Sequence, residues 1–126
     1  MTTIDLTKDN FQDTIVNNGM VIIDWWADWC GPCKAFAPTF ETKSEEHKDI
    51  VFAKVDTEAN QDLSQMAQIT SIPTLMVFRD QILLFSQAGA LPPAQLEELI
   101  QATKNLNMDD VRAEIAKQQA EKENKN

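Results

Sequence analysis

The feature that most constrains the fold of this 126-residue chain is a pair of cysteines, Cys30 and Cys33, separated by two residues. The apolar segment 20–27 (MVIIDWWA) precedes the pair and is typical of a buried strand. The residues from Cys30 to about Lys48 follow a helical pattern. The thiols are therefore expected where a strand turns into a helix. There, free backbone N–H groups and the positive end of the helix dipole stabilise a thiolate at Cys30.

The spacing of the two cysteines favours redox chemistry. Two intervening residues bring the second sulfur within bonding reach, so Cys33 can attack a mixed disulfide formed on Cys30. We therefore expect Cys30 to be the nucleophile and Cys33 the resolving thiol. Two other uses stay open. A structural disulfide over so short a loop would contribute only about 2 kcal/mol by chain entropy. A zinc site would need a second copy of the chain, because His47 is the only further Cys or His.

The order of apolar and amphipathic segments predicts an α/β fold. Strands are expected at 20–27, 50–56, 73–79 and 82–88. Helices are expected at 7–17, 30–48, 58–68 and 91–106. Strands and helices alternate early, and then two strands follow in succession. This order predicts a central mixed β-sheet flanked by helices, with a C-terminal antiparallel hairpin covered by the final helix.

Length and charge indicate one cytoplasmic domain. The length suits a single core, which we place in residues 1–106. The formal net charge of −9 argues against nucleic acid and anionic membranes as partners, because both would repel the protein. The first ten residues lack the apolar region of a signal peptide, and no apolar run is long enough to span a bilayer. We expect a soluble cytoplasmic monomer.

Residues 107–126 form a polar C-terminal extension, expected to be a short helix or a mobile tail. Its apolar pair, Val111 and Ile115, lies one helical turn apart, and either of two aspartates, Asp109 or Asp110, could cap a short helix. Burying two side chains would not offset the entropy of ordering more than a dozen residues. The chain from about Lys117 onward is therefore predicted to be mobile in solution.

Three segments together resemble the thioredoxin family. They are DWWADWCGPCKAFAP at 24–38, SIPT at 71–74 and AGAL at 88–91, and the resemblance covers about residues 3–106. It implies a thioredoxin fold and a protein-disulfide reductase that cycles its two cysteines between dithiol and disulfide. It also implies client proteins that contain disulfides, an NADPH-dependent thioredoxin reductase as electron donor, and no bound cofactor.

The resemblance further implies a proton-transfer role for Asp24. This residue matches the family's buried carboxylate, which accepts and donates the proton of the resolving cysteine, and Lys54 matches the lysine paired with it. The sequence supports the first assignment independently. A carboxylate in an apolar central strand loses hydration, so its pKa is expected to rise toward the working pH.

The client-binding surface is likewise implied by the family. Ile72-Pro73 matches the cis-proline loop, whose backbone pairs with an extended client segment, so Ile72 is expected to bind through its main chain. The same surface is completed by five further residues: Trp29, Gly31, Pro32, Gly89 and Ala90.

Several positions depart from the family pattern or carry another expectation. Asp80-Gln81 stands where Asn-Gly is frequent, so the hairpin turn is expected to be of another type. Gln68 replaces a common glycine, and Thr70 a common arginine. We expect His47 to be solvated, and Trp25 and Trp26 to pack in or near the core.

One alternative function stays open, a binding module or chaperone of the same fold without turnover. Pro32 favours a reductase, because oxidases and isomerases of the family usually carry a histidine between the cysteines.

Overall fold

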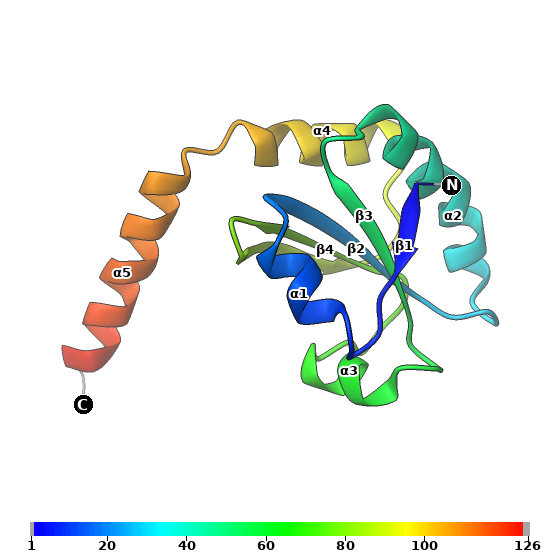
Figure 1. Cartoon of the computed structure of the whole chain (residues 1–126), viewed down its shortest axis with the longest axis horizontal. Helices are drawn as coiled ribbons and strands as arrows, with labels where there is room; N and C mark the ends of the chain where they lie inside the picture. Colours follow the sequence, from blue (N-terminus) through cyan, green and yellow to red (C-terminus); the bar gives the residue numbers. More distant parts are fainter. Residues whose placement is uncertain (1, 125–126) are drawn as a thin grey trace.

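The computed structural model describes residues 2–124 and shows one mixed sheet with helices on both faces (Figure 1). The strands are β1 (Thr3–Asp5), β2 (Met20–Trp26), β3 (Val51–Asp56), β4 (Thr74–Arg79) and β5 (Ile82–Ala88). The helices are α1 (Phe11–Val16), α2 (Gly31–Glu46), α3 (Gln61–Met66), α4 (Pro93–Lys104) and α5 (Met108–Asn124). The strand order is β1-β3-β2-β4-β5, with β1, β3 and β2 parallel and β4 and β5 antiparallel. The predicted mixed sheet with a C-terminal hairpin is confirmed.

Alternation along the central strand β2 builds a core on each face of the sheet. Met20 and Ile22 pack on one face with residues of α2 and α4. Val21, Ile23 and Trp25 pack on the other face with residues of α1 and α3. Successive strand side chains point to opposite faces, which is why a continuous apolar run can serve both cores. Parity along the strand places Asp24 on the face that α2 covers.

The short edge strand β1 is absent from the elements expected from the sequence. It has three residues, and its central Ile4 remains 42% exposed. A segment this short gives no alternation to detect. Its strand conformation comes from pairing with β3, in register from Thr3 opposite Phe52 to Asp5 opposite Lys54.

The hairpin between β4 and β5 corrects one sequence expectation. Asp80 and Gln81 have φ angles of 52° and 70°, so both adopt the positive φ that a type I′ turn requires. The turn that Asn-Gly usually forms is therefore retained with two residues that favour it less. The backbone N–H of Asp80 also donates to the carbonyl of Gly19 at 2.8 Å.

Gln68, the residue that replaces a common glycine, also lies in the left-handed region, with a φ of 60°. A residue with a side chain loses about 1–2 kcal/mol of stability in this conformation. Glycine avoids that loss, but it also makes the unfolded chain more flexible, which offsets part of the gain. We expect Gln68→Gly to raise the free energy of unfolding by about 0.5–1 kcal/mol. Denaturant melts would measure this change. Gln65→Gly, inside α3, is the matched control and should destabilise by about 1 kcal/mol. A loss of stability in Gln68→Gly would contradict the strained backbone.

The C-terminal helix α5 is longer than the expected short helix, with 17 residues. Its start is capped by Asn107 rather than by an aspartate, because Asn107 Oδ1 accepts the N–H of Asp110 at 3.2 Å. Met108 is buried, and Arg112 reaches Asp80 of the hairpin turn at 3.4 Å. Beyond this start the helix stands away from the sheet (Figure 1). Mobility in solution from about Lys117 stays a prediction.

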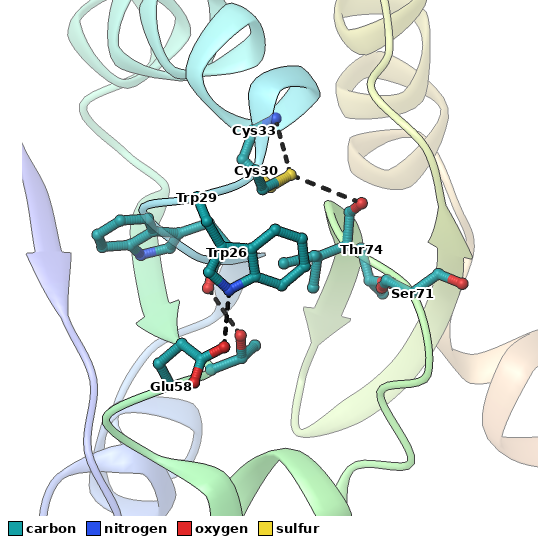
Figure 2. The surroundings of a disulfide bond; sticks show 9 residues. Trp26, Trp29, Cys30, Cys33, Glu58, Ser71 and Thr74 are labelled. Carbon is teal, nitrogen blue, oxygen red and sulfur yellow. Dashed lines mark hydrogen bonds between the residues drawn. A yellow bond between two sulfur atoms is a disulfide. The ribbon is translucent and has the colours of Figure 1, made fainter.

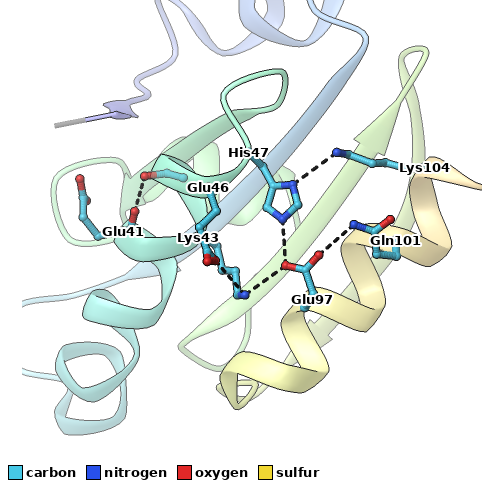
Figure 3. Close-up of polar contacts among 8 residues, drawn as sticks. Glu41, Lys43, Glu46, His47, Glu97, Gln101 and Lys104 are labelled. Carbon is cyan, nitrogen blue, oxygen red and sulfur yellow. Dashed lines mark hydrogen bonds and ion pairs between the residues drawn. The ribbon is translucent and has the colours of Figure 1, made fainter.

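The solvated position expected for His47 is wrong. Its ring lies between α2 and α4, with Nε2 2.8 Å from Oε1 of Glu97 and Nδ1 3.3 Å from Nζ of Lys104 (Figure 3). The pKa of Glu97 falls to about 2 because it accepts hydrogen bonds from three neighbours: Gln101, His47 and Lys43. The cluster therefore links α2 to α4, and α2 carries the cysteines.

Candidate active site

The two cysteines lie at one end of the sheet, where β2 and β3 end and β4 begins. Cys30 is the N-cap residue of α2, and its Sγ accepts the backbone N–H of Cys33 at 3.2 Å (Figure 2). The chain before the helix turns back on itself, with the N–H of Cys30 bonded to the carbonyl of Ala27. A sulfur in this position receives a backbone donor and the positive end of the helix dipole. The local geometry thus favours a thiolate at Cys30 in the reduced protein.

The cysteines form a disulfide in this structure, with their Cα atoms 5.2 Å apart. Both are nearly fully buried, whereas Gly31 and Pro32 between them are exposed. The bond joins the N-cap residue to the first turn of one helix, as the spacing predicted. Closing so short a loop constrains the rest of the chain very little.

The loop before β4 faces the disulfide. The Ile72-Pro73 peptide bond is cis, as the family resemblance implied, and the carbonyl oxygen of Ile72 lies 3.8 Å from Sγ of Cys30. Gly89 holds this loop from the end of β5, because its N–H donates to the carbonyl of Pro73 at 2.7 Å. Gly89 has a φ of 111°, which other residues rarely adopt. Its neighbour Ala90 is exposed.

Trp29 is the most prominent apolar side chain at this end of the sheet, with 69% of its surface exposed. Its indole Nε1 donates to Oε1 of Glu58 at 2.7 Å. Glu58 belongs to the loop after β3, and Thr57 anchors that loop by bonding the carbonyl of Trp26 through its N–H and its hydroxyl. The sequence reasoning did not single out Glu58. Its position just after β3, a strand parallel to β2, could have indicated it, because this position lies at the same edge of the sheet as the cysteines.

Asp24 lies in the middle of the sheet and is 1% exposed. Within residues 2–124, neither of its carboxylate oxygens has a hydrogen-bond partner. Loss of hydration raises the pKa of Asp24 from 3.8 to about 6, while the positive charge of Lys54 opposes that rise. A carboxyl group with this pKa can both accept and donate a proton near neutral pH.

Lys54 is the cross-strand neighbour of Asp24 in the β2–β3 ladder. Its Nζ lies over the Trp26 ring, 4.9 Å from the ring centroid, which is a cation–π contact. The ion pairs found within residues 2–124 do not include one between Lys54 and Asp24. Lys54 therefore lowers the pKa of Asp24 by electrostatic attraction across the ladder rather than by a direct ion pair.

The structure brings the cysteine pair and the cis-proline loop to one end of the sheet, whereas Asp24 and Lys54 lie within the β2–β3 ladder. A cysteine pair at a helix N-terminus, with the backbone carbonyl of Ile72 beside its first sulfur, can exchange disulfides with an extended peptide. Within residues 2–124, no helix combines the length and the apolar character that crossing a bilayer requires.

Comparisons with known proteins identify the same chemistry. The Thioredoxin family model matches residues 2–102. The chain is 51% identical over 119 residues to the protein named "Putative thioredoxin 2" from Streptomyces coelicolor, covering 94% of this chain and 89% of that one. It is 42% identical over 95 residues to a thioredoxin of Coprinus comatus, covering 74% of this chain and 89% of that protein.

Solved structures agree with this relationship. The thioredoxin of Plasmodium falciparum superposes with a TM-score of 0.73 and 34% identity, covering 79% of this chain and 97% of that one. A mutant thioredoxin of Halobacterium salinarum gives a TM-score of 0.76 and 30% identity, covering 83% of this chain and 92% of that one. With its redox-active pair in place at the helix N-terminus, the chain belongs to the thioredoxin family and is a thiol-disulfide oxidoreductase.

Proposed function

We propose that this protein reduces disulfides in client proteins with Cys30 as the nucleophile and Cys33 as the resolving thiol. The observation that carries the assignment is the position of the Cys30 sulfur, which receives the N–H of Cys33 and lies beside the carbonyl of Ile72. Within residues 2–124, Cys33 has no such contact with the loop. A client strand bonded to the backbone at Ile72 would bring its disulfide to Cys30 first.

The reaction proceeds through two exchange steps. The Cys30 thiolate attacks one sulfur of the client disulfide, forms a mixed disulfide and expels the second client sulfur as a thiolate. The Cys33 thiol then passes its proton to the Asp24 carboxylate and attacks the Cys30 sulfur. This attack forms the Cys30–Cys33 disulfide and expels the first client sulfur. The client gains two electrons and takes up two protons, one of which Asp24 can return.

The same proposal covers the partners and the contact surface. Trp29, Gly31 and Pro32 would meet the client on the helix side, and Ile72-Pro73, Gly89 and Ala90 on the loop side. An NADPH-dependent thioredoxin reductase would return the disulfide to the dithiol. We propose that the protein acts as a cytoplasmic monomer without a bound cofactor.

Catalysed reduction of insulin by dithiothreitol tests the proposed activity. Substoichiometric protein should shorten the time before the freed insulin chain precipitates, and the Cys30→Ser, Cys33→Ser double variant should give the uncatalysed time. This assay also separates a reductase from a binding module or chaperone, which would delay precipitation rather than advance it.

Removing the C-terminal extension should affect stability more than activity. None of the site residues lies beyond Ala90, so truncation after Leu106 should leave insulin reduction within about twofold of the full chain. Loss of the buried Met108 should lower the free energy of unfolding by about 1–3 kcal/mol. Thermal melts with Met108→Ala as the matched variant would measure this loss. A drop in activity of more than about tenfold with the fold retained would place the extension in partner binding.

A further inference from the structure

A groove beside the redox centre bears on which client segments the protein accepts. It is lined by Trp29, Thr57, Ile69, Thr70, Ser71 and Ile72. It adjoins the reactive sulfur, because Ile72 contributes to the groove and its carbonyl oxygen lies 3.8 Å from Sγ of Cys30. A client segment paired with the backbone at Ile72 would therefore place the side chains next to its attacked cysteine in or along this groove.

The groove itself carries no charge. None of its six lining residues has an ionisable side chain, and three of them present hydroxyl groups. The Thr57 hydroxyl donates a hydrogen bond to the carbonyl of Trp26 at 3.0 Å. Thr70 lines the groove and is exposed to solvent. A client side chain in the groove therefore responds to the charges that surround it.

Two carboxylates neighbour residues that line the groove. Glu58 follows Thr57, and its Oε1 is held 2.7 Å from Nε1 of Trp29, so its charge is fixed against one wall of the groove. Asp28 precedes Trp29 and is exposed. Asp28 is thus adjacent to a groove residue in the chain, and Glu58 is adjacent to one and contacts another.

The cations near the centre lie outside the groove. Lys54 Nζ is placed over the Trp26 ring, and Lys34 follows Cys33 on α2. Neither residue lines the groove. A cationic side chain entering there would meet negative charge that no groove cation offsets, whereas an acidic one would meet repulsion.

We infer that this groove selects client segments with a cationic residue beside the attacked cysteine, and that Thr70 sets this preference by leaving the groove without a positive charge. The inference deepens the proposed function and rests on it. Charges about 6 Å apart at a protein surface change a rate several-fold at low ionic strength, and salt screens the effect. Exchanging a lysine for a glutamate in the client should therefore change the rate about tenfold.

Two synthetic peptides, each closed by one disulfide and differing only in lysine or glutamate on both sides of the cysteines, provide the test. The pre-reduced full chain is mixed with each oxidised peptide, and the second-order rate constant is followed by tryptophan fluorescence. We expect the lysine peptide to react about tenfold faster at about 20 mM salt and about twofold faster at about 500 mM. Glu58→Gln keeps an acceptor for the Trp29 indole and should lower the ratio about threefold.

Thr70→Arg should abolish or invert the preference by placing a cation at the groove. Gln118→Arg, on exposed α5, adds the same charge far from the site and should leave the ratio within about twofold. Equal rates for both peptides in the unmodified protein, or equal changes in the two arginine variants, would overturn the inference while leaving the reductase intact. Failure to reduce either peptide would contradict the proposed function itself.

Discussion

Cys33→Ser is expected to convert the protein from a reductase into a covalent trap for its clients. The variant keeps Cys30 at the helix N-terminus, so the first attack proceeds. The mixed disulfide then has no internal thiol to cleave it. Turnover should fall by about 100-fold or more, because resolution changes from an intramolecular to a bimolecular step. Non-reducing gels of cell extract passed over the immobilised variant should show proteins that dithiothreitol releases.

Cys30→Ser is the matched control for this experiment. It retains the Cys33 thiol, which within residues 2–124 has no hydrogen bond to the cis-proline loop and should capture little. Equal trapping by the two variants, or none by Cys33→Ser, would contradict the assignment of nucleophile and resolving thiol.

Asp24→Asn is expected to slow disulfide reduction about 10- to 100-fold at neutral pH. The substitution preserves shape and removes the group that we propose takes the proton of Cys33. The effect should fall toward the low end of general acid–base catalysis, since water can partly replace the carboxylate. The pH dependence of the rate should also lose the inflection near pH 6 that the raised pKa produces. An unchanged pH profile would leave Asp24 with a structural role alone.

The same substitution should stabilise the disulfide form above pH 6. The folded state binds the Asp24 proton more tightly than the unfolded chain does. Its stabilising contribution is therefore complete below pH 3.8 and is lost as the pH rises through about 6. A pKa raised from 3.8 to about 6 corresponds to about 3 kcal/mol at 1.36 kcal/mol per pH unit. Asp24→Asn should therefore gain about 3 kcal/mol relative to the unmodified protein between about pH 4 and about pH 8. If the stabilities of Asp24→Asn and of the unmodified protein differ by the same amount at every pH in this range, a buried carboxylate with a raised pKa would be contradicted.

The central elements could be predicted because their local sequence pattern agrees with the tertiary packing that they adopt. β2 is apolar on both faces since both are covered, and the CGPC turn needs the helix that follows it. β1 could not be predicted from its own three residues, because only the ladder with β3 makes it a strand. The start of α5 differs from the expected capping by Asp109 or Asp110 for a similar reason, since Met108 becomes buried only through tertiary contacts.

In the site, too, features that depend on neighbouring residues could be predicted, and contacts between residues far apart in the chain could not. The cysteine pair and the buried Asp24 follow from spacing and from the apolar strand around them. Glu58 does not, because its partner Trp29 is 29 residues away in the sequence and meets it only across the sheet edge. The contact of Lys54 with Trp26 is equally invisible in the sequence, and the family resemblance implied a pairing with Asp24 instead.

Turnover coupled to NADPH tests the central claim most directly. The protein, an NADPH-dependent thioredoxin reductase and excess insulin are combined, and NADPH oxidation is followed by absorbance. The account predicts that NADPH is consumed mole for mole with insulin disulfides, over many cycles for each Cys30–Cys33 pair, and that the Cys33→Ser variant stops this consumption. Consumption that ends after one equivalent of NADPH per protein molecule, with insulin still oxidised, would contradict it.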